Sequence, residues 1–101
     1  MKIIVTLHKQ IRATELLEKL LECLSQRGET NWIRGISAAL GEIALLTDEG
    51  FANARSLYRT MMEGGRGFAE YCVWDEDESQ RQKANKEIDG IRTELWEIFE
   101  S

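Results

Sequence analysis

Apolar residues recur along most of the chain at spacings of three and four, which is the period of an amphipathic helix. This pattern predicts four helices, over residues 3–27, 31–46, 49–62 and 81–100. The last segment carries the clearest apolar stripe, formed by Ala84, Ile88, Ile91, Leu95, Ile98 and Phe99. The sequence contains no proline, a residue that sheet edges and turns use often. We therefore predict an all-α fold.

Residues with known positional preferences mark the expected helix ends. Gly28 suits the left-handed position that follows a helix C-cap. Thr30 or Asn31 is expected to cap the second helix, and Thr47 or Asp48 the third, because their side chains accept bonds from free backbone N–H groups. Residues 3–7 are rich in β-branched side chains, so an extended start is the alternative for the first segment.

Short connections between the helices imply antiparallel neighbours. The expected architecture is a compact antiparallel bundle of four main helices that forms a single domain over residues 1–101. The connection at 63–80 is longer than a usual loop, so a short extra helix is expected within 64–80. Phe68, Tyr71 and Trp74 recur there at a spacing of three, which indicates a helical turn over 68–74. At least two of these aromatic side chains are expected to close the open end of the bundle.

Charge is distributed unevenly along the chain. Residues 1–60 hold eight Lys/Arg and seven Asp/Glu, a net charge of +1, whereas residues 61–101 hold five and eleven, a net charge of −6. Asp89 and Arg92, with Glu94 and Glu97 nearby, suit a solvated outer face of the last helix. An acidic field repels nucleic acid and anionic membranes and speeds encounter with basic proteins. The alternative is that this acidity only maintains solubility.

No set of residues supports catalysis or metal binding. His8 is the only histidine and is expected at the surface or boundary of the first helical turns. Cys23 and Cys72 are isolated, so free buried thiols are favoured over a single disulfide. The stretch Gly64-Gly65-Arg66-Gly67 lacks the Lys-Ser/Thr pair and the preceding strand of a phosphate-binding loop, and is interpreted as a helix stop. We predict no enzymatic activity and no cofactor. The apolar run before Lys9 is too short for a signal peptide, which predicts a cytoplasmic protein.

The acidic run at residues 75–78 has several interpretations. It lacks the alternating ligands and central glycine of a calcium-binding EF-hand loop. It could be a solvated turn whose charge the dipole of the last helix favours. It could equally be a docking surface, because Phe68, Tyr71 and Trp74 are of the residue types that anchor interfaces.

Three stretches carry a resemblance to a known type of protein. They are Asn31-Trp32, residues 64–70, and residues 85–96 with Ile88, Leu95 and the pair Ile91-Arg92. With these stretches the chain resembles an uncharacterised bacterial family of short all-helical proteins, which is similar to the small immunity proteins encoded beside secreted toxins. The resemblance implies a helical scaffold and a toxin-neutralising role.

These observations together predict an immunity protein that binds a cognate toxin, a basic nuclease such as an RNase, through an acidic surface. The alternative is a self-associating helical adaptor or regulatory interaction module. The predicted partner is a protein, with no nucleic acid and no membrane, and a monomer is favoured over an oligomer. The predicted contact residues are Glu70, Tyr71, Trp74, Asp75, Glu76, Asp77, Glu78, Glu94 and Glu97.

Overall fold

The structure is a computed structural model that describes residues 2–63 and 67–100, with side chains from residue 7 onward. It contains four α-helices, α1 (Lys2–Gln26), α2 (Ile33–Ile43), α3 (Asp48–Met62) and α4 (Glu78–Glu100), and the short 3-10 helix η1 (Phe68–Glu70). The described residues contain no strand. The all-α prediction is therefore confirmed. The helix stop predicted at residues 64–66 lies outside the described residues.

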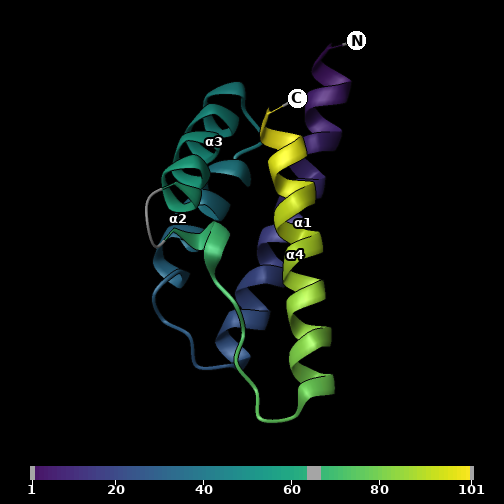
Figure 1. Ribbon diagram of the computed structural model, residues 1–101. Helices are drawn as coiled ribbons and strands as arrows, with labels where there is room; N and C mark the ends of the chain where they lie inside the picture. Colours follow the sequence, from purple (N-terminus) through teal and green to yellow (C-terminus); the bar gives the residue numbers. More distant parts are fainter. Residues whose placement is uncertain (1, 64–66, 101) are drawn as a thin grey trace.

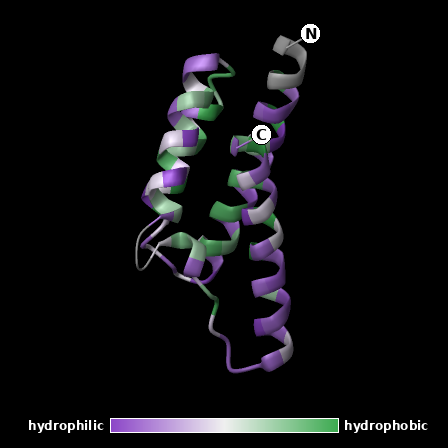
Figure 2. Ribbon diagram, turned by 45° about the horizontal axis from the view of Figure 1, so that its top comes forward, coloured by the Kyte–Doolittle hydropathy of each residue, from purple (hydrophilic) through white to green (hydrophobic). Residues whose placement is uncertain are grey.

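The helices form an elongated antiparallel bundle, 47 × 22 × 21 Å in extent. Figure 1 shows α1 and α4 side by side in opposite directions, so that both chain ends lie at the top, with the shorter α2–α3 pair packed on one side. Figure 2 shows that hydrophilic residues dominate the lower half of α4, where α2 and α3 do not reach. None of the described helices is both long and apolar enough to span a bilayer.

The ends of α1 and α2 confirm one expectation and correct three. Helix α1 starts at Lys2, so the extended alternative for residues 3–7 is wrong. Gly28 follows α1 in the left-handed conformation with φ 70°, as predicted. Helix α2 starts only at Ile33, with Trp32 at its cap position, so neither Thr30 nor Asn31 caps it. It ends at Ile43 rather than at residue 46, because the chain turns sharply at Leu46, where φ is 57°.

Side chains fix the starts of α3 and α4. The hydroxyl of Thr47 accepts a hydrogen bond from the backbone N–H of Gly50 at 2.9 Å, which confirms Thr47 as the cap of α3. Helix α4 starts at Glu78, three residues before the predicted start at Arg81. The reason is Asp77, whose carboxylate accepts from the N–H of Gln80 at 3.1 Å in the manner of an N-cap.

The core joins all four helices and the connection. Leucines of α1 pack against Ile36 and Ile43 of α2, Tyr58 of α3, and the apolar stripe of α4. The ring of Phe99 lies 5.5 Å from that of Phe51 and 5.4 Å from that of Tyr58, which ties the end of α4 to α3. Burial of this apolar surface is the main source of the stability of the fold.

The aromatic residues of the connection close one side of the bundle. Phe68 is fully buried, with its ring 5.5 Å from Trp32 and 5.8 Å from Tyr71, and Tyr71 is half-buried. Trp74 is 75% exposed. Phe68 and Tyr71 are therefore packed against the bundle as expected, but they cover one side of it rather than its open end. The predicted helical turn covers only 68–70, and the chain beyond it has no helical structure until Glu78.

Candidate partner-binding surface

Two polar side chains of α4 hold the connection in place. The guanidinium of Arg92 donates to the carbonyls of Phe68 at 2.5 Å and Tyr71 at 2.8 Å, and also to the carboxylate of Asp89. The side-chain amide of Asn85 accepts from the N–H of Val73 at 2.6 Å and donates to its carbonyl at 3.1 Å. Residues 68–73 are therefore anchored to α4 rather than free to move as a loop.

The burial of Arg92 corrects one prediction. The pair Asp89–Arg92 exists, but Arg92 is only 7% exposed, whereas the sequence placed it on a solvated outer face. The returning connection covers this part of α4, and its backbone carbonyls satisfy a guanidinium that would be costly to bury alone.

Anchoring of the connection forces Trp74 outward. Along this extended stretch Cys72 is exposed, Val73 is buried and Trp74 is exposed, which is the alternation of an extended backbone. The guanidinium of Arg81 lies over the indole of Trp74, 4.8 Å from its centroid. An exposed tryptophan with one face held by a cation is an apolar anchor available to a partner.

Two of the four acids in the run 75–78 have structural roles. Asp75 accepts from the N–H of Asp77 at 2.8 Å and pairs with Arg27 at 3.3 Å, and these contacts lower the pKa of its carboxyl, the first more than the second. Asp77 caps α4. Glu78 is exposed and accepts from the amide of Gln82 at 3.2 Å, while Glu76 is exposed and makes no polar contact with the described residues. Glu76 and Glu78 are therefore the carboxylates of this run that remain available.

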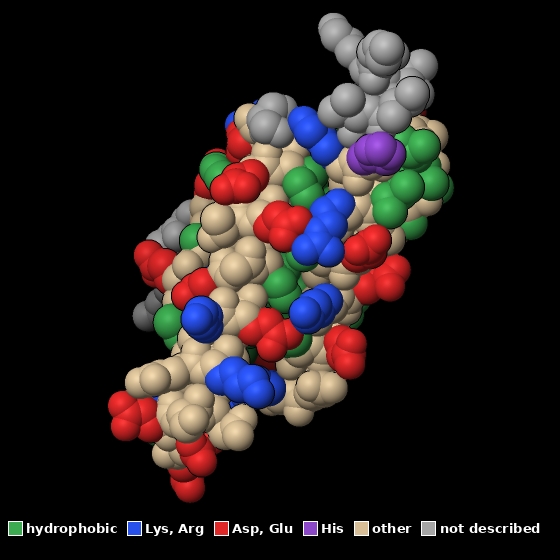
Figure 3. Space-filling model, turned by 90° about the vertical axis from the view of Figure 1, so that its right-hand side faces the viewer, with side chains coloured by type: hydrophobic (Ala, Val, Ile, Leu, Met, Phe, Trp, Pro, Cys, Tyr) green, Lys and Arg blue, Asp and Glu red, His purple; other side chains and the backbone are tan. Residues whose placement is uncertain are grey.

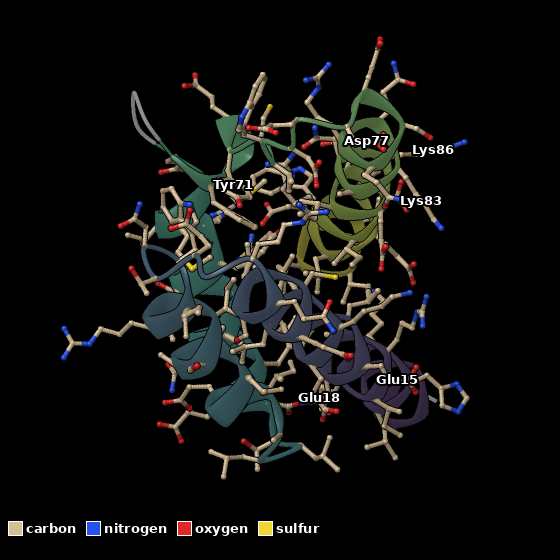
Figure 4. The ribbon with its side chains drawn as sticks, turned by 90° about the horizontal axis from the view of Figure 1, so that it is seen from below. Glu15, Glu18, Tyr71, Asp77, Lys83 and Lys86 are labelled. Atoms are coloured by element: carbon tan, nitrogen blue, oxygen red, sulfur yellow. The ribbon has the colours of Figure 1, made fainter. Side chains whose placement is uncertain are left out.

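Cations lie close to this acidic run. Arg27 donates to the carboxylate of Asp75, and Arg81 donates to the backbone carbonyl of the same residue. Figure 4 shows Lys83 and Lys86 projecting outward from α4 beyond Asp77, which lies at the start of the helix. In Figure 3 carboxylates gather at the lower tip, while both signs of charge alternate above it. On this face the carboxylates are therefore concentrated at the tip, and charges of both signs are mixed above it.

The predicted contact residues outside the acidic run and Trp74 fall on different faces of the molecule. Glu94 binds the guanidinium of Arg12 at 2.5 and 3.0 Å, which lowers the pKa of its carboxyl and ties α4 to α1. The carboxylates of Glu70 of η1 and Glu97 of α4 are exposed and make no hydrogen bond or ion pair with the described residues. Burial, and secondarily the charge of Glu29, raises the pKa of Tyr71. The assignment of these residues to an interface stays a prediction.

A groove that the sequence did not indicate lies between η1 and the C-terminal half of α4. It has a volume of about 370 Å³ and is lined by Met62 of α3, Ala69 of η1, and Asp89, Arg92, Thr93, Trp96 and Glu97 of α4. One signal in the sequence could have indicated this groove. Residues 89, 92–93 and 96–97 recur at the helical period and therefore lie on one face of α4. The missing information was that η1 folds back beside this face.

A second surface feature is an apolar patch at the other end of the bundle. Leu7 and Ile11 of α1 are 36% and 44% exposed, and Leu45 and Leu46 of the α2–α3 link are 63% and 45% exposed. A hollow of about 200 Å³ lies between these elements, lined by Ile11, Thr14, Glu15, Ala44 and Leu46. The sequence placed Leu46 inside a helix, so this patch was missed.

Other reactive groups are scattered. Cys23 and Cys72 are free as predicted, but only Cys23 is partly buried and Cys72 is exposed, which corrects the expectation of two buried thiols. Burial, and then the charge of Glu87, raises the pKa of the Cys23 thiol. His8 is exposed, as expected. In the described part of the chain no group of three His, Cys, Asp or Glu side chains is arranged to hold a metal ion.

No protein-family model, curated protein or solved structure matches this chain. The resemblance to small immunity proteins therefore stays a prediction, and the function has to be argued from the surface itself.

Proposed function

We propose that this protein is a cytoplasmic immunity protein that binds a cognate bacterial toxin domain, a basic nuclease, and neutralises it by occupying its nucleic-acid site. The observation that supports this proposal most is Trp74, which is 75% exposed although Asn85 holds Val73 before it and Arg27 and Arg81 hold Asp75 after it. A large apolar side chain held rigidly in solvent costs little entropy when it is buried in a partner.

The charges around Trp74 define the chemistry of the partner. Glu76 and Glu78 follow it closely in the chain and are exposed, while the guanidinium of Arg81 lies over its indole. Glu70 and Glu97 are two further exposed carboxylates on other faces, on η1 and α4. A nuclease cleft built for phosphates presents Lys and Arg, so these carboxylates would meet opposite charges. Trp74 supplies apolar contact area, and the carboxylates supply orientation and a fast encounter.

The proposal is tested by rescue of growth and by binding kinetics. Cells that express the toxin domain encoded beside this gene should survive when this chain is co-expressed. The variant Trp74→Ala should weaken binding roughly 30-fold, because a central tryptophan of an interface contributes about 2 kcal/mol. The double variant Glu76→Lys/Glu78→Lys should slow association about tenfold at low salt, with little change in dissociation.

The chain offers a matched control for this charge reversal. Glu18 and Glu22 of α1 are exposed, and Glu22 accepts from the amide of Gln26 as Glu78 does from Gln82. The variant Glu18→Lys/Glu22→Lys therefore makes the same change in charge and hydrogen bonding at another site. Equal effects of the two double variants, or the absence of any toxin gene beside this one, would contradict the proposal.

The alternative function, a self-associating helical adaptor, is favoured by the apolar patch formed by Leu7, Ile11, Leu45 and Leu46. Exposed apolar side chains that gather beside a hollow are typical of protein–protein contacts. This function predicts a dimer that does not need the acidic tip. Light scattering at increasing protein concentration separates it from a monomeric inhibitor.

A further inference from the structure

The groove between η1 and α4 combines apolar walls with an acidic rim. Met62 and Ala69 form one wall, and the indole of Trp96, 39% exposed, lies on the other. In Figure 1, η1 and the C-terminal half of α4 face each other across the front of the bundle. Because Asp89, Trp96 and Glu97 repeat at seven and eight residues along α4, they lie on one helix face above this groove.

The positive charge in the groove is already neutralised. Arg92 is the only cation among the described residues that line it, and its guanidinium is bound to two carbonyls and to Asp89 and stacked over Phe68 at 5.4 Å. In contrast, the side chain of Asp89 is 65% exposed, and Glu97 is exposed without an ion pair to the described residues. The uncompensated charge that a ligand meets at the rim is therefore the carboxylate of Glu97, with the second carboxylate oxygen of Asp89 as a further acceptor.

From these features we propose that the groove is a docking site for an arginine side chain on an exposed segment of the protein partner. The guanidinium stacks on the indole of Trp96 and donates hydrogen bonds to Glu97 and to the outer oxygen of Asp89. The aliphatic stem of the arginine packs against Met62 and Ala69. Arginine fits better than lysine because its planar, weakly hydrated head both stacks on an aromatic ring and donates to two acceptors at once.

This inference rests on the proposed function, since the arginine would belong to the toxin, but it can be tested without the toxin. The probe is the peptide acetyl-Ala-Arg-Ala-amide, titrated into the isotope-labelled full chain and followed by NMR. We expect millimolar binding, as for a single anchored side chain, with the largest shifts at the Trp96 indole N–H and at the amides of Ala69, Thr93 and Glu97. The citrulline peptide, which has the same shape without the charge, should bind at least about fivefold more weakly.

Matched variants separate a groove from a general acidic attraction. Glu97→Gln should weaken binding of the arginine peptide about fivefold, whereas Glu18→Gln, which removes the same charge from an exposed site on α1, should change it less than about twofold. Trp96→Leu should lower the affinity for the arginine peptide more than the affinity for the corresponding lysine peptide, acetyl-Ala-Lys-Ala-amide. The Phe68 and Val73 amides report whether each variant keeps the native fold.

Several results would overturn the inference. They are equal binding of the arginine and citrulline peptides, equal effects of Glu97→Gln and Glu18→Gln, and shifts of the Trp96 resonances that depend on protein concentration, which would place a second copy in the groove. A toxin that binds normally to the Glu97→Gln variant but poorly to Glu76→Lys/Glu78→Lys would refute the arginine site and leave the immunity function standing. Peptide binding without toxin rescue would refute the immunity function alone.

Discussion

At the scale of single residues, Arg92 determines how the connection reaches the candidate surface. Arg92 is 7% exposed, and its guanidinium donates to the carbonyls of Phe68 in η1 and of Tyr71 beyond it. We expect Arg92→Leu to lower the free energy of unfolding by about 2–4 kcal/mol, because the Phe68 carbonyl loses one of its two donors and the Tyr71 carbonyl loses the guanidinium. For a small domain this is a large share of the total stability. Denaturant titration would measure it.

A control for Arg92 is available on α2. Arg34 is exposed and its side chain makes no polar contact with the described residues, so Arg34→Leu should change the unfolding free energy by less than about 0.5 kcal/mol. If the two variants unfolded at the same denaturant concentration, Arg92 would not be the support of the connection.

Residue patterns predicted part of this arrangement. The period of the α4 stripe identified Ile88, Ile91 and Leu95 as core, and all three are buried. The same period placed Arg92 on the outside, because helical periodicity describes a face and not what later covers it. The non-local contacts of Arg92 with Phe68 and Tyr71, more than twenty positions away, are invisible to a local pattern.

At the scale of elements, Asn85 pairs the connection with α4. Its amide both accepts from and donates to the backbone of Val73, as a neighbouring strand would. We expect Asn85→Ala to release residues 71–75 while α4 stays helical, so the Val73 amide should exchange with solvent at least about tenfold faster. Hydrogen exchange followed by NMR would measure this. Exposed Asn53→Ala, on α3, is the control, and unchanged exchange at Val73 in Asn85→Ala would contradict the prediction.

Ion pairs between elements give the fold a dependence on acid pH. Glu100 binds Arg59 and Arg55 of α3, and Glu94 binds Arg12 of α1, which lowers the pKa of both carboxyls in the folded state. Groups with a lowered folded pKa contribute stability above their unfolded pKa, and this contribution is lost as pH falls through the folded value. The melting temperature should therefore be steady near neutrality and fall below about pH 4.

The double variant Glu94→Gln/Glu100→Gln tests the source of this acid dependence. It should melt lower than the native chain at pH 7 and lose less of its melting temperature between pH 5 and pH 3. The control Glu18→Gln/Glu76→Gln removes two exposed carboxylates that make no ion pair with the described residues. Identical pH profiles for both double variants would exclude these interhelical pairs as the cause.

Element boundaries were predictable where a side chain near the boundary carries the signal. Gly28 and Thr47 are such residues, and both behave as predicted. The start of α4 was predicted three residues too late, because the acidic run containing Asp77 indicates surface charge as readily as a helix cap. In the structure Asp77 lies directly before the helix and caps it. The non-helical path after η1 depends on Asn85 and Arg92, so no local signal could reveal it.

At the scale of the whole molecule, the two exposed features lie at opposite ends of the bundle. Trp74 and the acidic run lie at the lower end, where the connection turns into α4, and the Leu45–Leu46 patch lies beside the N-terminal half of α1. Only two of the four clustered acids remain available, so the sequence overstated the acidic surface. It located Trp74 correctly on the connection but expected helical rather than extended backbone there.

The oligomeric state decides between the two functions, and Leu46 offers a direct test. Leu46 has left-handed backbone, which costs a leucine roughly 1 kcal/mol, and its side chain is 45% exposed. In a monomer Leu46→Asn should change the unfolding free energy by less than about 1 kcal/mol. Asparagine tolerates the left-handed backbone better than leucine, and this gain offsets the apolar contacts that the side chain loses in the hollow. In a dimer that buries this patch, the variant should dissociate and melt lower.

We expect light scattering to show a monomer for both proteins, with melting temperatures independent of concentration. A native chain whose mass doubles with concentration, and a Leu46→Asn variant whose mass does not, would favour the adaptor over the immunity protein.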